Sequence, residues 1–303
     1  MKAKTAILFA VLAAVVYSLL TPVSKLLLMN VPPVAEAGLL YLGAGAGMAA
    51  VYGAQRVRGR KSGRPSVGRK DLKYIAAMVI LDTAAPILLL LGLSLSAPES
   101  VSLLNNFEIV ATTVIAAAFF RETVSRKLAL SVAVMTVSCA LLSLDDEASL
   151  SFSVGSVFVL LACICWGFEN NCTSSLSAKD TRQIVIIKGF GSGTASLLIS
   201  LIIREGFVPS WSGVLVMALG FLTVGLSVYF YVLAQSRIGA ARTSSYYAVS
   251  PFVGVLLSLL LFRDLPGPLF WVALALMAVG VFLNVRDTQQ AEKGRVASDS
   301  PSQ

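Results

Sequence analysis

The chain has 303 residues, 56% of them hydrophobic and only 13% charged, and its mean hydropathy is +0.81. Soluble globular chains are nearer 45–50% apolar and about 25% charged, so this composition excludes a soluble protein. The net charge of +8 does not indicate nucleic-acid binding, because the basic residues gather in segment 56–73 between two apolar runs, as in membrane-anchoring loops. Since the chain has no histidine and no CxxC motif, we expect neither a metal site nor a cofactor.

Apolar runs of roughly 20 residues, the length that crosses a bilayer as a helix, recur along the chain. The first run is longer than a signal-peptide core and is followed by Thr21 and Pro22 rather than by a small-residue cleavage site, so we interpret it as a spanning helix. The sequence predicts an all-α integral membrane protein with ten transmembrane helices, at about 5–28, 35–55, 72–94, 98–120, 127–144, 153–176, 183–203, 212–235, 240–262 and 268–285.

The distribution of lysine and arginine predicts the orientation, because cytoplasmic loops carry an excess of these residues. Segment 56–73 and both chain ends fall on one side of the ten-helix topology, whereas Arg204 and Arg263 fall on the other. We therefore expect a multi-pass protein of the plasma (inner) membrane with both termini cytoplasmic. The polar, serine-rich residues 288–303 predict a disordered cytoplasmic tail.

The two halves of the chain resemble each other. Residues 97–122 align with residues 239–264, since both segments begin with small residues, continue as an apolar run and end at Phe-Arg-acid. Residues 14–18 align with residues 163–167 in the same order along the chain. Each half contains five predicted helices, and because five is odd, the second copy must enter the bilayer upside down.

This duplication predicts two inverted five-helix repeats, residues 1–146 and 147–287, an arrangement that usually gives alternating access to a site near the midplane. A glycine triplet recurs at the same place in both halves. We interpret the triplets as sites of close helix packing rather than as ligand contacts; they are Gly43, Gly45 and Gly47 in the first half and Gly189, Gly191 and Gly193 in the second.

Charged side chains in mid-bilayer are costly, so by default they mark a pathway or a site. Lys25 and Glu36 lie at the outer ends of predicted helices, where they can reach the interface or pair with each other. Asp82 and Glu108 lie near the middle of consecutive helices joined by a short turn, so we expect them at similar depth. Two carboxylates in one dry site cannot both stay ionised cheaply, which makes protons or an organic cation candidate ligands.

Glu169 and Lys188 lie at similar depths in two further consecutive helices, about 9–12 Å from the inner end at 1.5 Å per residue. Two interpretations stay open. The pair can be a structural salt bridge that joins the two helices. Alternatively, Lys188 receives a substrate carboxylate while Glu169 gates or balances it.

Amides and aromatic rings accompany these charges. The segments LLNNFE and FENNCT place Asn105, Asn106, Asn170 and Asn171 beside Glu108 and Glu169, where amides can solvate a carboxylate or a substrate. Adjacent helical positions are about 100° apart, so each pair spreads over a face. Most aromatic residues in membrane helices only pack, but rings also attract cations, and the candidates to line a cavity are Trp166 and Tyr246 or Tyr247.

The ten helices, the five-plus-five inverted duplication and the proline-bearing segment SPFVGVLLSLLLFRD together resemble the EamA-type transporters of the drug/metabolite transporter superfamily. The resemblance covers about residues 5–285. It implies a central cavity lined by both halves, and ATP-independent transport, often export, of amino acids or other small metabolites. The motif fits residues 239–264 well but 97–122 less well, where Ile109 replaces the proline and Glu108 precedes it, which implies a more charged site than is usual.

The leading hypothesis is a secondary transporter for small polar or zwitterionic metabolites such as amino acids, with protons as a candidate coupling ion. The alternative is an organic-cation transporter for choline-like molecules or drugs. The excess of three acidic residues over one lysine deep in the predicted helices favours this alternative. A membrane-embedded enzyme would need a base, metal or phosphate-binding motif that the sequence lacks, and a scaffold would need more loop surface. The sequence leaves open whether the protein is a monomer or a homodimer.

Overall fold

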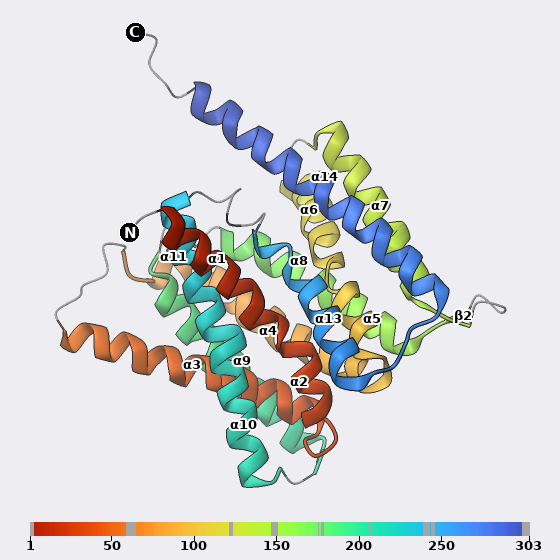
Figure 1. The fold of residues 1–303 in the computed structure, drawn as a ribbon. Helices are drawn as coiled ribbons and strands as arrows, with labels where there is room; N and C mark the ends of the chain where they lie inside the picture. Colours follow the sequence, from red (N-terminus) through yellow and green to blue (C-terminus); the bar gives the residue numbers. More distant parts are fainter. Residues whose placement is uncertain are drawn as a thin grey trace.

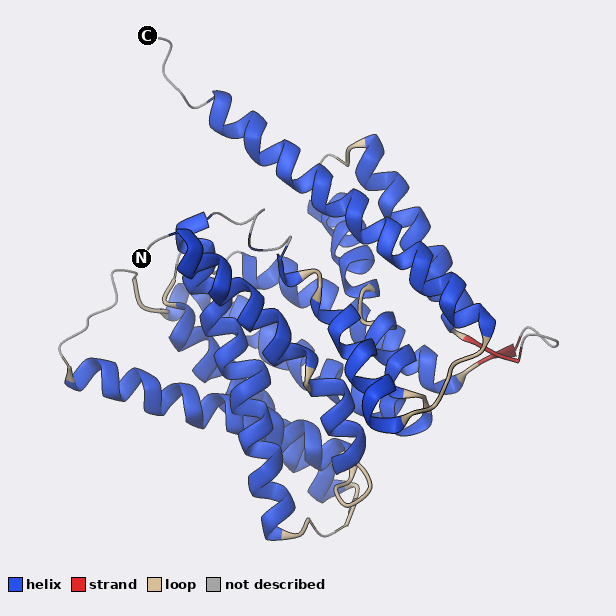
Figure 2. Ribbon diagram, in the orientation of Figure 1, coloured by secondary structure: helices blue, strands red, loops and turns tan. Residues whose placement is uncertain are grey.

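The computed structural model describes residues 3–58, 65–120, 124–146, 151–174, 176, 179–206, 208–238, 243 and 246–298. These residues are almost entirely helical (Figure 2), and the strands among them form one antiparallel pair, β1 (Leu144–Asp146) with β2 (Ser151–Phe152). The helices are α1 (Ala3–Ser18), α2 (Leu20–Leu27), α3 (Pro33–Val57), η1 (Arg69–Asp71), α4 (Leu72–Leu95), α5 (Pro98–Leu104), α6 (Phe107–Phe120), α7 (Arg126–Leu142), α8 (Val154–Ser174), α9 (Thr181–Ile202), α10 (Ser210–Gly220), η2 (Phe221–Leu226), α11 (Ser227–Ile238), α13 (Ser250–Phe262) and α14 (Pro268–Ser298). Figure 1 labels the α-helices.

The helices agree with a multi-pass membrane protein. Helix α7 has 17 residues and α13 has 13, so both are shorter than the roughly 20 residues of a full crossing. They correspond to the predicted fifth and ninth spans, and the count of ten spans is therefore not confirmed. Among the described residues, eight stretches are long and apolar enough to cross a bilayer: Lys4–Leu27, Pro33–Val57, Arg69–Leu95, Pro98–Phe119, Val154–Thr173, Thr181–Ile202, Ser210–Tyr231 and Pro268–Gln290.

Three spans that we predicted as continuous helices are interrupted near the middle. The first divides into α1 and α2 beside Leu19, where Pro22 has no N–H and would clash with the carbonyl four residues earlier. The fourth divides into α5 and α6 at Asn105 and Asn106, and the Asn106 side chain donates to the Leu103 carbonyl at 3.1 Å, competing with the helix ladder. The eighth contains the π-helical turn η2 between α10 and α11.

Two other prolines lie within predicted spans without interrupting a helix. Pro86 lies inside α4, which stays helical from Leu72 to Leu95, and Pro251 lies in the first turn of α13, where a missing N–H costs nothing. The last helix also departs from the prediction. Helix α14 continues to Ser298, so residues 288–298 are helical rather than disordered, as their good helix formers Gln, Ala, Glu, Lys and Arg allow.

The packing of the helices shows the two repeats. Each half repeats one succession of helices, and corresponding helices of the two halves meet: α3 packs on α9, α5 on α13 and α7 on α14. Two further contacts pair the first predicted span of one half with the third of the other, since α1 packs on α11 and α4 on α8. An approximate two-fold axis between the halves produces this pattern, and Figure 1 shows α7 and α14 lying side by side.

The glycine triplets lie at close helix contacts: Gly45, Gly189 and Gly193 where α3 crosses α9, and Gly43, Gly47 and Gly191 against α10, η2 and α4. A Cβ atom on Gly189 would lie 2.4 Å from the backbone of Gly45, and a Cβ atom on Gly193 would lie 2.7 Å from the backbone nitrogen of Leu42. Both distances are far below a normal contact, so these positions admit no side chain. The interpretation of the triplets as close packing sites is confirmed.

A carboxylate from the second repeat binds the first turn of α3. The oxygens of Glu205 accept hydrogen bonds from the backbone nitrogens of Val34 and Ala35, each at 2.9 Å, and one oxygen also accepts from the Ser200 hydroxyl. The residue at the N-cap of α3, Pro32, has no side chain that could do this. Glu205 therefore satisfies free N–H groups and places negative charge at the positive end of the helix dipole.

Replacing Glu205 by alanine should lower the free energy of unfolding by about 1 kcal/mol, the usual cost of losing a charged cap. Equilibrium unfolding of the purified protein in detergent micelles measures this change. Asp264→Ala, which removes an exposed acid next to α13, is the matched control and should leave stability unchanged. Equal effects of the two substitutions would show that Glu205 does not act as a cap.

Candidate functional site

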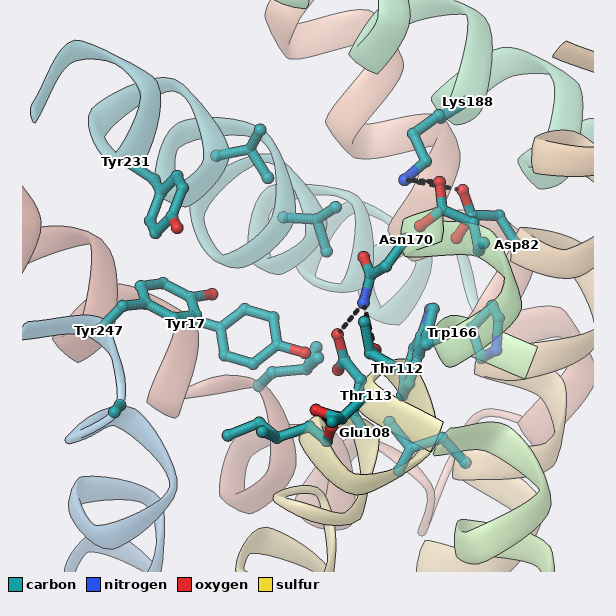
Figure 3. Close-up of a pocket in the computed structure, with 18 of the residues that line it drawn as sticks. Tyr17, Asp82, Glu108, Thr112, Thr113, Trp166, Asn170, Lys188, Tyr231 and Tyr247 are labelled. Carbon is teal, nitrogen blue, oxygen red and sulfur yellow. Dashed lines mark hydrogen bonds and ion pairs between the residues drawn. The ribbon is translucent and has the colours of Figure 1, made fainter. Parts of the chain in front are cut away.

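A cavity of about 690 Å³ lies between the two repeats (Figure 3). Helices α3, α4 and α6 of the first half and α8, α9 and α11 of the second contribute to its wall. The wall is mostly apolar with a small number of polar groups, which is typical of a site for a small molecule. The polar and aromatic residues that line it are Tyr17, Tyr41, Asp82, Glu108, Thr112, Thr113, Trp166, Glu169, Asn170, Lys188, Tyr231, Tyr247, Asn284 and Thr288.

The lining of the cavity reaches much further toward one end of the helices than toward the other. Along α4 its lining stops at Leu89 and Leu90, and Leu93 one turn further is completely buried. In the other direction the lining continues to Thr288 of α14. This residue lies level with the start of α7, as shown by the hydrogen bond of 2.5 Å that the Ser125 hydroxyl donates to the neighbouring Asp287. An apolar seal therefore closes the end near the α4–α5 turn, and the cavity extends toward the end where α7 begins.

One lysine joins two carboxylates on the cavity wall. The Lys188 ammonium of α9 lies 2.9 Å from Asp82 Oδ2 of α4 and 2.9 Å from Glu169 Oε1 of α8. Both carboxylates are almost completely buried. The hydroxyl of Tyr41 donates to Asp82 at 3.2 Å, and Thr173 donates to Glu169. The predicted Glu169–Lys188 pair is therefore present, and it belongs to a triad that joins three helices.

The triad gives Asp82 a partner that we did not predict. Asp82 and Glu108 line the same cavity, but Asp82 binds Lys188, which it shares with Glu169. Depth along a helix does not determine the direction of a side chain around it. Asp82 points to α8 and α9, whereas Glu108 points to the Asn170 side of the cavity (Figure 3).

Glu108 has an amide as its partner. The Asn170 side-chain nitrogen donates to Glu108 Oε1 at 2.6 Å and lies 3.4 Å from the Thr112 hydroxyl. Thr112 is one helical turn after Glu108, so the two face the same side of α6. Among the described residues no lysine or arginine forms an ion pair with Glu108, whose accessible part faces the cavity.

Three tyrosines form the opposite side of the cavity. The ring centroid of Tyr247 lies 5.7 Å from that of Tyr17 and 5.2 Å from that of Tyr231. Figure 3 shows these rings facing the cavity across from Lys188 and Asp82. The cavity is therefore divided into an aromatic half and a charged half.

The structure brings most of the predicted site residues to the cavity, but not all. Asp82, Glu108, Glu169, Lys188, Asn170, Trp166 and Tyr247 line it. Tyr246 is 36% exposed and lies outside the lining. Asn105 and Asn106 form the break between α5 and α6, also away from the lining. Asn171 donates to the carbonyls of Gly167 and Thr112 and so fastens α8 to α6.

The two outer charges do not pair with each other. The Lys25 ammonium donates to the carbonyls of Leu93 and Ser96, at 2.6 and 2.7 Å, and so caps the C-terminus of α4. Glu36 is completely buried, and its oxygens have no hydrogen-bond partner among the described residues. Neither residue lines the cavity.

Several lining residues were not among our predictions. Tyr17 is the repeat counterpart of Trp166, because residues 14–18 align with 163–167, so the alignment already contained a signal for it. Thr112 lies one turn from Glu108, and helical spacing points to it in the same way. Tyr41 carried no signal, since a tyrosine in a glycine-rich apolar segment usually only packs.

Comparison with known proteins agrees with this architecture. A model of the EamA-like transporter family matches residues 4–144 and 153–286, once on each repeat. One solved structure, described only as "Crystal structure of protein", superposes with a TM-score of 0.65 at 17% sequence identity, covering 95% of this chain and 99% of that chain. At this identity the likeness shows the fold alone. No curated protein matches the sequence.

Proposed function

The chain belongs to the EamA-like transporter family, and we propose that it is a secondary transporter which moves small polar or zwitterionic metabolites, such as amino acids, by alternating access. The observation that carries the proposal is the cavity. It lies between two repeats of opposite orientation and contains four ionisable groups at mid-depth, Asp82, Glu108, Glu169 and Lys188. Repeats that rock around such a site expose it to either side in turn.

Interrupted helices support this mechanism. The break between α1 and α2 and the π-helical turn η2 both adjoin the cavity, through Leu20 and Val224. Irregular backbone at membrane depth is tolerated where it is buried in protein or lines a cavity. Such points can absorb the change in backbone angles that a rocking motion requires.

We further propose that the protein is an exporter and that this structure is its inward-facing state. The excess of lysine and arginine assigns the start of α7 to the cytoplasmic side, together with both termini. The cavity extends toward that side and is sealed by leucines toward the other. A substrate would then enter from the cytoplasm, and a proton held by one of the paired carboxylates is a candidate coupling ion.

Transport into reconstituted vesicles tests this function. Vesicles that contain the protein should take up one or more radiolabelled amino acids or amines faster than empty vesicles. Thr112→Trp should abolish the difference because it places a large ring in the cavity, whereas Thr136→Trp on the exposed face of α7 should not. If neither amino acids nor amines cross faster than in empty vesicles, the transporter proposal fails.

A further inference from the structure

Two of the three N–H donors of Lys188 already serve carboxylates of the protein itself. Its ammonium already binds two carboxylates at 2.9 Å each, and these come from two different helices. A substrate carboxylate that displaced Asp82 or Glu169 would leave a nearly buried charge without a partner, which costs several kcal/mol, roughly 3–5. The lysine therefore serves first to compensate the charge of Asp82 and Glu169, and a substrate carboxylate would compete with them for it.

The remaining charge of the cavity is negative. Its wall carries the three carboxyl groups of Asp82, Glu108 and Glu169 against the one ammonium of Lys188. Among the described residues Glu108 forms no ion pair, and its carboxylate accepts a hydrogen bond from the Asn170 amide. Low-dielectric walls strengthen the field of a charge inside a cleft, so the region in front of Glu108 attracts cations and repels anions.

The aromatic half of the cavity favours the same ligand. Tyr17, Tyr231 and Tyr247 present ring faces and edges to the cavity, and ring faces attract ammonium groups. Apolar residues beside them, such as Leu20 and Val228, can bury a hydrocarbon skeleton. Figure 3 shows the Glu108 carboxyl group between the tyrosines and the Lys188–Asp82 pair.

We infer that the substrates of this transporter are organic amines without a carboxylate, whose ammonium group binds Glu108 while the carbon skeleton packs against the tyrosines. The inference rests on the proposed transport function and replaces amino acids by amines as its substrates. It selects the cationic class over the zwitterionic class, because the cavity wall carries three carboxyl groups against one ammonium, and that ammonium already binds two of them. Asn170 orients Glu108 through its 2.6 Å hydrogen bond.

Three probes that share one skeleton test the charge preference directly. 2-Phenylethylamine is a cation at neutral pH, phenylalanine a zwitterion and 3-phenylpropionate an anion. Isothermal titration of the full-length protein in detergent should give the tightest binding for 2-phenylethylamine. Phenylalanine should bind at least about tenfold more weakly, and 3-phenylpropionate should not bind. Equal or tighter binding of phenylalanine or 3-phenylpropionate would overturn the inference.

A pair of substitutions assigns the effect to Glu108. Glu108→Gln keeps the shape of the side chain and should weaken 2-phenylethylamine binding about tenfold or more. Glu99→Gln neutralises another buried acid of the same span, outside the cavity lining, and should leave the affinity unchanged. If the two variants bind equally well, Glu108 is not the ammonium site. Should Glu108→Gln not fold, the probe series on the unchanged protein decides.

The outcomes separate this inference from the proposed function. Vesicles that transport phenylalanine but not 2-phenylethylamine would sink the amine inference and leave the transport function intact. Vesicles that transport neither these two compounds nor any other amine or amino acid would sink both. Uptake of the amine that disappears in Glu108→Gln, but persists in Glu99→Gln, would support both.

Discussion

Replacing Lys188 by methionine will lower the free energy of unfolding by about 3–5 kcal/mol, the cost of leaving buried charges without a partner. Asp82 and Glu169 are both nearly inaccessible and share this one ammonium. Methionine fills a similar volume, so the loss arises from charge rather than from a void. Equilibrium unfolding of the purified protein in mixed micelles, compared with the unchanged protein, measures the effect.

Two controls define the cause of this loss. The variant Asp82→Asn, Glu169→Gln, Lys188→Met removes all three charges and should recover most of the stability, because neutral groups of the same shape need no ion pair. Lys179→Met breaks the Lys179–Asp71 ion pair outside the cavity, whose N–O distance is a similar 3.0 Å. The Asp71 carboxylate is 15% exposed, whereas those of Asp82 and Glu169 are 1% and 3% exposed. Water can solvate Asp71 when its partner is lost, so the effect should be much smaller. Equal effects of Lys188→Met and Lys179→Met would refute a buried triad.

The sequence predicts the overall architecture well because that architecture depends on length and polarity. A bilayer requires runs of about 20 apolar residues with their backbone hydrogen bonds inside the segment, and such runs can be read without knowing the packing. The repeat is readable for a related reason. Residues 41–47 and 188–193 must both be rich in glycine because α3 and α9 touch backbone to backbone there.

The arrangement of the site is less predictable, because it depends on how helices rotate and cross. The spacing along the chain gave the depths of Glu169 and Lys188 correctly enough to pair them. It could not show that α4 turns Asp82 toward the same lysine. Nor does hydropathy detect a break such as that at Asn105 and Asn106, since the residues on both sides remain apolar.

Substituting alanine for Gly189 will destabilise the protein by about 3 kcal/mol, the upper part of the usual range for overpacking. The added methyl group would lie 2.4 Å from the Cα and N atoms of Gly45 and 2.7 Å from the Tyr41 carbonyl oxygen. All of these are backbone atoms, which cannot move aside as a flexible side chain can. Helices α3 and α9 would have to separate, and α3 also carries Tyr41, which binds Asp82 of the triad.

Gly53 provides the matched control, because it lies in α3, the helix that packs on α9, but has nothing within 4 Å of the position of an added Cβ atom. Alanine is a better helix former than glycine by about 1 kcal/mol, so Gly53→Ala should slightly stabilise the protein. The two identical substitutions are thus expected to have opposite signs in the same unfolding experiment. If Gly189→Ala also stabilises, the α3–α9 crossing is not as close as the structure has it, and the two repeats meet in some other way.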